Sequence, residues 1–303
     1  MTVHGETAMV PATSKGEAAK ALKKFTATSN KANEAYDAEL NATVETGAHG
    51  AIDNAGLRAQ KKLRPQGAPN FSPLELDDPR FLIPKQAGWP KFFVADVRSN
   101  RTQGGRWFLA FQRDAAGAPW KVAYLSVLRN AAIPEFAKDA QGYVKAVPAG
   151  TSGGLSVPPG KISETYTRFL QEGGGDFAPG PQTSGLRKGR EERQARFSHE
   201  AMRADFSDVA AKPPEYTPLA LRTEDGGALV FFASHHYEKQ TAARGHSPQV
   251  SNKLVRTMLR GEPKQSVIYT QVAQQAVNVP SQQSGGDIRF LNRLSGITGA
   301  KGQ

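Results

Sequence analysis

Apolar and small residues recur at steps of three and four along the N-terminal part of the chain. These positions are Ala18, Leu22, Phe25, Ser29, Ala32, Tyr36 and Leu40. This spacing lines up one face of a helix, and the preceding Ser14-Lys15-Gly16-Glu17 is typical of a capping box. The pattern therefore predicts one long helix that ends near Gly47, followed by a shorter helix from Ala51 to Leu63.

Beyond the turn-rich segment 65–79 the pattern becomes that of strands. Aromatic and β-branched residues cluster in four runs, at 81–83, 92–94, 107–111 and 120–128. The connections 100–105 and 114–119 are short and rich in Gly, Asn and Asp, so we expect antiparallel hairpins. Helices followed by an antiparallel meander predict an α+β fold in which the long helix packs on one sheet face.

The same order of elements recurs after a flexible stretch of small residues at 149–154. A helix is predicted around Ile162, Tyr166 and Phe169, and a charged helix from Leu186 to Phe206. Strand patterns follow at 216–223, 228–237, 266–273 and 288–291. This recurrence predicts an internal repeat of roughly 150 residues, a size that fits a duplicated domain.

The length of 303 residues also favours two domains, since typical domains run to roughly 100–200 residues. We predict two tandem similar domains, each with N-terminal helices packed on a curved antiparallel sheet. The expected division is a flexible N-terminus at 1–14, a first domain at 15–150, and a second domain at 151–303 with a flexible C-terminal tail. Nine residues are predicted to be buried: Leu22, Phe25, Phe93, Phe108, Val122, Phe169, Leu221, Val230 and Phe232.

Composition narrows the range of functions. The absence of cysteine excludes disulfides, thiolate metal sites and cysteine nucleophiles, and leans toward an exported protein. The net charge of +11 predicts an attraction to anionic surfaces. Lys and Arg outnumber Asp and Glu by 20 to 14 in residues 1–150 and by 19 to 14 in residues 151–303, whereas a DNA-binding module usually concentrates its excess.

Four segments carry a resemblance to a known family. They are Ala32-Asn33-Glu34-Ala35-Tyr36-Asp37, Thr43-Val44-Glu45-Thr46-Gly47, Arg80-Phe81-Leu82-Ile83-Pro84 and the run from Leu219 to Val230. These residues resemble a family of secreted lipoproteins from filamentous actinobacteria that has no established activity. The resemblance implies an extracellular or cell-envelope location, with an export signal and a lipid-modified cysteine expected in a longer precursor. The helix-then-meander order of each half also resembles the nuclear-transport-factor-2-like cone.

The most reactive-looking cluster in the sequence is His235-His236-Tyr237-Glu238. Adjacent residues of a strand face opposite sides, so His235 and His236 are not expected to bind one metal, and we predict neither a metal nor a cofactor. Tyr36 lies on the apolar stripe and is predicted to be a core residue, with Asp37 solvated. No His and Asp pair, and no nucleophile elbow, stands out in the sequence. Tyr36, His235, His236 and Tyr237 remain the candidates for a pocket.

Two basic patches are candidates for binding. They are Arg187, Lys188 and Arg190, and then Lys253, Arg256 and Arg260, which would line one face of a short helix. A solvated helix face is the simpler interpretation of such patches. The expected partner is an anionic envelope surface, such as lipid headgroups or wall polymer, and no specific nucleic acid is expected.

These observations favour an exported cell-envelope protein that serves as a non-enzymatic binding or structural module. The alternative is a small-molecule isomerase or hydrolase with its site in one cone mouth. A deep pocket with two or more convergent acid, base or His groups would favour that alternative. A nucleic-acid-binding protein is the third hypothesis, and it requires one continuous basic face.

Overall fold

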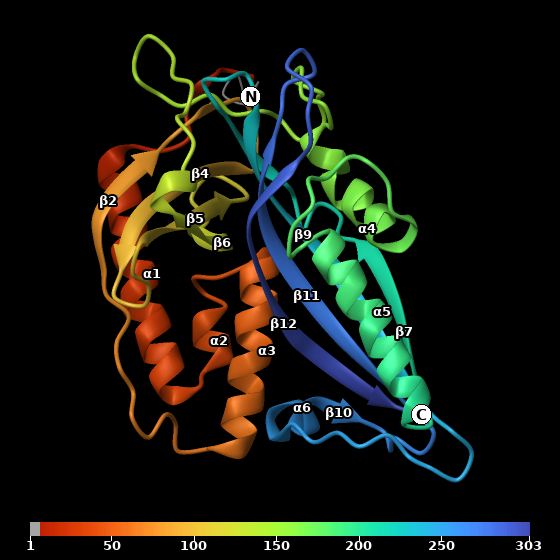
Figure 1. Cartoon of the computed structure of the whole chain (residues 1–303). Coiled ribbons are helices and arrows are strands. Elements are labelled where there is room, and N and C mark those ends of the chain that lie inside the picture. The colour runs from red at the N-terminus through yellow and green to blue at the C-terminus, as the bar shows by residue number, and fades with distance from the viewer. Residues whose placement is uncertain (1–6) are drawn as a thin grey trace.

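Two large, mainly antiparallel sheets with helices packed against them form the protein in the computed structural model, which describes residues 7–303 (Figure 1). The fold is α+β, as the sequence predicts. The predicted flexible N-terminus lies outside the described residues over positions 1–6. The rest of the segment predicted to be flexible is described. Its strand β1 (Val10–Pro11) pairs with β3 (Lys85–Gln86), and this pairing holds residues 10–11 against the first half of the protein.

The first half begins with three helices: α1 (Lys15–Ala35), α2 (Ala38–Asn41) and α3 (Gly47–Leu63). The Ser14 side chain caps α1 by accepting a hydrogen bond from the backbone amide of Glu17, as predicted. The prediction of one helix reaching Gly47 is wrong. Tyr36 adopts a left-handed conformation with a φ of 55° that ends α1, and the side chain of Asp37 then caps α2.

The first sheet follows chain order: β2 (Leu76–Leu82), β4 (Lys91–Ser99), β5 (Gly105–Arg113) and β6 (Lys121–Arg129). All neighbouring strands pair antiparallel, which confirms the predicted hairpins. Strands β4, β5 and β6 are buried on both faces, whereas the edge strand β2 is largely exposed. Phe93 and Phe111 pack with Phe25 of α1, whereas Phe92 and Phe108 on the opposite face belong to a core shared with the second sheet.

The second half contains nine elements: α4 (Ile162–Glu172), α5 (Ser184–His199), β7 (Met202–Ala210), β8 (Leu219–Arg222), β9 (Ala228–Ala242), α6 (Lys253–Met258), β10 (Leu259–Arg260), β11 (Ser266–Val279) and β12 (Arg289–Gly302). The sheet order is β10-β12-β11-β9-β7, with β8 also paired to β9. Two predictions are wrong here. The charged helix ends at His199, because Met202–Ala210 pairs with β9, and the predicted flexible tail is β12, which pairs with β11 along its length.

The molecule is built in four layers, with α1 outside the first sheet and α4 outside the second. Side chains alternate between the two faces of β9, and this places one apolar face on each side of the sheet. Phe231 faces the core between the sheets, whereas Val230 and Phe232 pack with Tyr166 of α4. All nine residues predicted to be buried are buried, each at most 7% exposed. Helix α3 contacts both sheets through β6 and β12.

The strand paths β2-β4-β5-β6 and β7-β9-β11-β12 both follow chain order, as two copies of one fold would. The halves are closely joined, because they share a core and because residues preceding the predicted boundary at 150 pair with β8, as in the bridge between Ala146 and Leu221. The division into two domains and the cone-like shape of each half stay predictions. No helix of the described residues has the length and apolar character to span a membrane.

Candidate functional sites

Two cavities of the molecule are each lined by a histidine and at least one carboxylate. The first cavity, of about 530 Å³, lies among α1, α3, β6 and β12. The second cavity, of about 790 Å³, lies among α5, α6, β9, β11 and β12. Both volumes fall in the usual range of ligand pockets, roughly 300–1,000 Å³.

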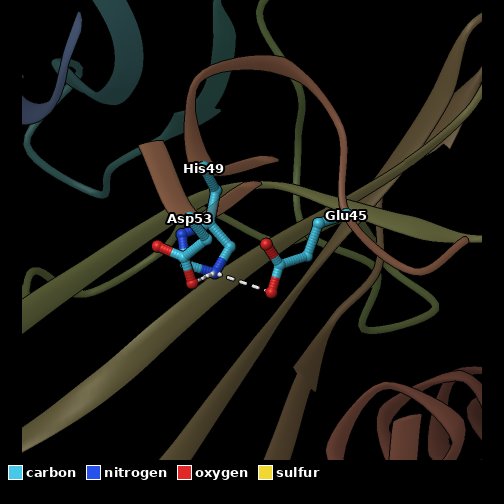
Figure 2. Close-up of side chains that lie close together, drawn as sticks. All are labelled: Glu45, His49 and Asp53. Atoms are coloured by element: carbon cyan, nitrogen blue, oxygen red, sulfur yellow. Dashed lines mark ion pairs between the residues drawn. The ribbon is translucent and has the colours of Figure 1, made fainter. Parts of the chain in front are cut away.

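Glu45, His49 and Asp53 converge in the first cavity (Figure 2). His49 and Asp53 lie one turn apart on the same face of α3, and Glu45 lies just before the N-cap Thr46, where it pairs with Val122 of β6. Nε2 of His49 lies 3.5 Å from Oε1 of Glu45 and 3.8 Å from Oδ2 of Asp53. The Glu45 side chain is fully buried and that of Asp53 is 36% exposed, so the cluster runs from the interior to the cavity mouth.

Glu45 is an unusual carboxylate. Its Oε2 accepts a 2.7 Å hydrogen bond from the amide of Asn41, but its buried Oε1 has no hydrogen-bond partner among the described residues. Burial raises the pKa of Glu45 to about 7. Burial lowers the pKa of His49, but the carboxylates of Glu45 and Asp53 together raise it above its ordinary value. The cluster therefore gains or loses a proton near neutral pH.

Gln274 of β11 fixes the tautomer of His49. The Oε1 atom of Gln274 accepts a 2.8 Å hydrogen bond from the backbone amide of Leu125, and this orients the Gln274 NH₂ group toward Nδ1 of His49 at 3.3 Å. Nδ1 is therefore an acceptor, and the ring proton lies on Nε2, facing the two carboxylates. Because Nδ1 already accepts the Gln274 N–H, we expect the labile proton of the cluster on Glu45.

This tautomer opposes metal binding at the cluster. A metal would need the Nε2 lone pair, so the ring proton would move to Nδ1 and meet the N–H of Gln274. Rotating the Gln274 amide would instead break its hydrogen bond with Leu125.

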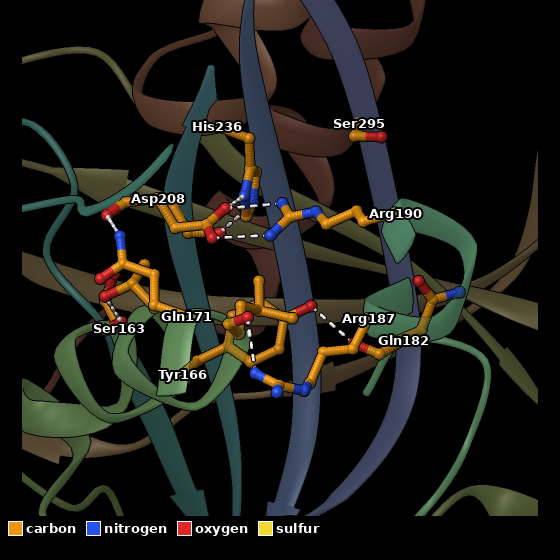
Figure 3. Close-up of polar contacts among 12 residues, drawn as sticks. Ser163, Tyr166, Gln171, Gln182, Arg187, Arg190, Asp208, His236 and Ser295 are labelled. Carbon is orange, nitrogen blue, oxygen red and sulfur yellow. Dashed lines mark hydrogen bonds and ion pairs between the residues drawn. The ribbon is translucent and has the colours of Figure 1, made fainter. Parts of the chain in front are cut away.

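A buried ion-pair network forms one wall of the second cavity (Figure 3). Asp208 of β7 and His236 of β9 are direct neighbours across the two strands. The Asp208 carboxylate accepts two 2.7 Å hydrogen bonds from Arg190 of α5 and lies 2.6 Å from Nδ1 of His236. Burial raises the pKa of Asp208, but hydrogen bonds from Arg190 and His236 outweigh it and hold the pKa below the ordinary range. Burial lowers the pKa of His236.

Asp208, His236 and Ser234 are connected in the order of a nucleophilic triad. The Oγ atom of Ser234 lies 2.8 Å from Nε2 of His236. Ser234, however, has no exposed surface, does not line the cavity, and also contacts Gln275 through its hydroxyl at 2.7 Å. A substrate in the cavity could not reach this hydroxyl, and both nitrogens of His236 are occupied.

The cavity also holds an arginine that forms no ion pair with a described residue. Arg193 pairs with Glu238 at 2.7 Å, and Arg190 pairs with Asp208. Arg293 of β12 lines the same cavity, and no carboxylate of the described residues lies within 4.0 Å of its guanidinium. It donates a 3.2 Å hydrogen bond to the hydroxyl of Ser295 and also interacts with the Tyr166 side chain of α4, and its buried Nε has no hydrogen-bond partner among the described residues. Burial and the nearby charge of Arg190 lower the pKa of Arg293, and they outweigh the opposite effects of Tyr166 and Asp208.

The structure separates the predicted binding residues. Arg190 points into the second cavity, Arg187 donates to the carbonyls of Phe169 and Leu170 at the end of α4, and Lys188 is exposed beside Glu192. Lys253 and Arg256 are exposed on α6, but Arg260 lies in β10, so the three do not share one helix face as predicted.

The pocket candidates also divide. His236 and Tyr237 line the second cavity, whereas His235 points away and packs edge-on against the ring of Tyr216, as strand alternation predicts. Tyr36 is half-buried rather than a core residue, because it ends α1 and lines the first cavity.

Sequence reasoning missed five functional candidates: Glu45, His49, Asp53, Asp208 and Arg293. His49 and Asp53 carried a usable signal, because a spacing of four residues places them on one helix face, but the predicted helix began at Ala51. Glu45 precedes the helix and is positioned by its pairing with Val122 of β6. Asp208 was missed because the helix predicted to run to Phe206 left no strand there, so no pairing of Asp208 with His236 could be predicted. Arg293 had no local signal.

Comparison with known proteins assigns the chain to a family. The family model described as "Domain of unknown function (DUF8094)" matches residues 9–302. The chain belongs to this family. An uncharacterized lipoprotein of Streptomyces coelicolor is 45% identical over 303 residues, covering 100% of this chain and 90% of the relative. An uncharacterized lipoprotein of Streptomyces avermitilis is 43% identical over 304 residues, again covering 100% and 90%.

A second Streptomyces coelicolor lipoprotein is 25% identical over 302 residues, covering 96% of this chain and 82% of the relative. These relatives confirm the predicted resemblance to lipoproteins of filamentous actinobacteria, and their names are those of membrane-anchored or envelope proteins. No solved structure shows a significant match.

Proposed function

We propose that this chain is a cell-envelope binding protein whose second cavity takes a small ligand with an anionic group and an apolar body. The observation that carries the proposal is Arg293, a cation in the cavity wall without a carboxylate partner among the described residues. Leaving a charge in such a place is costly unless something neutralises it. A carboxylate, phosphate or sulfate group of a ligand would do so with charge-assisted hydrogen bonds.

The charge balance of the cavity supports this ligand class. Two of its three arginines are neutralised by protein carboxylates, which leaves a net positive charge at Arg293. The paired arginines are also fixed by aromatic rings, since Arg190 lies 5.0 Å from the ring centre of Phe206 and Arg193 lies 5.1 Å from that of Phe197. A rigid site loses less entropy when it binds.

The remaining wall suits an apolar body. Leu186, Phe197, Val250, Val255, Tyr269 and Ile297 line the cavity. Acid–base chemistry has less support, because both nitrogens of His236 are hydrogen-bonded and Ser234 lies behind the wall. The isomerase or hydrolase hypothesis therefore ranks second, although acid, base and His groups do converge in both cavities.

The test compares ligands that differ only in charge. Hexanoate and hexyl phosphate are titrated by calorimetry against the wild-type chain, Arg293→Gln and Arg289→Gln, with hexanol as the neutral analogue. Arg289 is an exposed arginine on the same strand and serves as the matched control. We expect at least one anion to bind the wild type and Arg289→Gln, with at least a tenfold loss in Arg293→Gln. Equal binding by both variants, or binding of hexanol as tight as that of the anions, would overturn the proposal.

The envelope location also belongs to this proposal, in its finer form of a lipid-anchored exported protein. It is supported by relatives that are named lipoproteins and match this chain along its whole length. Fractionation of cells that express the native full-length protein, followed by detergent phase partition, tests it. Recovery in the detergent phase is expected, and recovery in the cytosol would contradict it.

A further inference from the structure

We propose that the first cavity is a binding site for a small organic cation, an amine whose ammonium group pairs with Asp53 and with Glu45 behind it. The site is separate from the anion pocket of the second cavity and does not depend on it. Three features of the described residues carry the proposal: an unpartnered buried carboxylate oxygen, an aromatic wall, and a histidine that cannot serve as a metal ligand.

The Oε1 atom of Glu45 is the feature that points to a ligand. The side chain has no exposed surface, it lines the cavity, and this oxygen has no hydrogen-bond partner among the described residues. Its carboxylate points toward His49 and Asp53 (Figure 2). The long 3.5 Å approach of Nε2 of His49 leaves the oxygen poorly compensated. A buried acceptor in this state favours a ligand that brings positive charge or N–H groups.

The charge around the cavity has the sign that such a ligand needs. Glu45 and Asp53 are both acidic, and His49 is the one basic side chain of the described residues within 4.0 Å of them. Arg101 lines the cavity too, but it is exposed and donates to the carbonyl of Ser72. The two carboxylates therefore dominate the inner end of the cavity, while Asp53, 36% exposed, is accessible from its mouth.

The wall provides a second means of cation recognition. Phe25, Tyr36, Phe71 and Trp107 line the cavity together with the two carboxylates. Aromatic faces attract cations through their quadrupole, and an aromatic cage closed by carboxylates is a recurring way to hold an ammonium group. An apolar substituent on the amine would contact Ile52 and Leu294, which also line the cavity.

The choice of an organic cation over a metal ion follows from Gln274. Its amide holds Nδ1 of His49 as an acceptor, so the Nε2 position that faces both carboxylates carries a proton instead of a free lone pair. The isosteric change Gln274→Glu would let residue 274 accept from both Leu125 and Nδ1. That variant would free the Nε2 lone pair and convert the cluster into a zinc site.

The experiment measures binding of benzylamine and of its neutral analogue benzyl alcohol by calorimetry. The variants are Asp53→Asn and Glu45→Gln, and the matched control is Glu39→Gln, an exposed glutamate near the site with a side chain 86% exposed. Arg293→Gln is included to separate this cavity from the second one. We expect benzylamine to bind the wild type, Glu39→Gln and Arg293→Gln alike, with at least a tenfold weaker affinity for Asp53→Asn and for benzyl alcohol.

Circular dichroism confirms that each variant is folded before titration, and Glu45→Gln provides a second charge deletion if Asp53→Asn unfolds. Zinc is titrated alone into the wild type and into Gln274→Glu, and uptake only by the variant supports the assigned tautomer. The proposal is overturned if benzylamine does not bind at millimolar concentration, or if benzyl alcohol or Asp53→Asn binds as well. Stoichiometric zinc uptake by the wild type that is lost in Asp53→Asn would identify a metal site instead.

Discussion

Replacement of Glu45 by glutamine should remove a pH-dependent cost from the folded state. Burial raises the pKa of Glu45 from its ordinary 4.5 to about 7. The folded state then holds the proton more tightly than the unfolded state does. Its contribution to the free energy of unfolding is therefore fully present below pH 4.5 and is lost as the pH rises to about 7.

The size of the effect follows from the two pKa values. One pKa unit corresponds to about 1.4 kcal/mol, so the difference between 4.5 and about 7 amounts to about 3 kcal/mol. Glutamine has the same shape and can still accept the hydrogen bond from Asn41. We therefore expect Glu45→Gln to resemble the wild type near pH 5 and to exceed its free energy of unfolding by about 3 kcal/mol near pH 8.

Urea unfolding at half-unit steps from pH 5 to pH 8 measures this difference. Glu39→Gln is the control. Because the Glu39 side chain is exposed, the free energy of unfolding of this variant should follow the same pH dependence as that of the wild type. Subtracting the wild-type profile removes the contributions of groups outside the cluster, such as Asp208, whose pKa is lowered. The pKa of His49 is raised in part by Glu45, so the contribution of His49 remains in the difference. A Glu45→Gln profile that also runs parallel to the wild type would refute the assignment of a raised pKa to the buried Glu45.

Three further outcomes are expected. Asp208→Asn should lower the free energy of unfolding by about 3–5 kcal/mol in urea denaturation, because it leaves the largely buried Arg190 without its ion-pair partner. Asp205→Asn is the control on β7: its side chain is 41% exposed and pairs with the exposed Arg203, so this change should have little effect. Phe232→Ala, in the fully buried core beside α4, should cost about 3–5 kcal/mol, and an unchanged melting temperature would contradict its place there. Binding of the whole chain to anionic vesicles, wall polymer and DNA should collapse together as salt rises, since charge attraction is screened over roughly 8 Å at physiological ionic strength; salt-resistant binding to one of them would contradict this.

Local patterns were sufficient wherever the physical cause is local. The hydroxyl of Ser14 caps the helix that begins one residue later, and the apolar stripe through Leu22 and Phe25 packs as its spacing predicts. Strand runs and short Gly-rich connections predicted the hairpins for the same reason. Where two local preferences competed, the sequence misled: Tyr36 continues the stripe, but its left-handed backbone ends the helix.

Only the tertiary structure decided what the two cavities contain. Glu45, His49 and Asp53 are close in sequence, and their spacing of four residues was visible. The group that fixes the proton on His49 is Gln274, which is 225 residues away in the sequence and lies on β11 of the second sheet. Arg293 likewise looks like one basic residue among many until β12 places it in a wall without a carboxylate partner among the described residues. The sequence by itself thus determined the α+β elements, the buried positions and the family, whereas packing of the two halves determined charge and protonation. The reason is physical: pKa values, tautomers and unpaired charges depend on burial and on neighbours brought from distant strands, and neither quantity is encoded in the local order of residues.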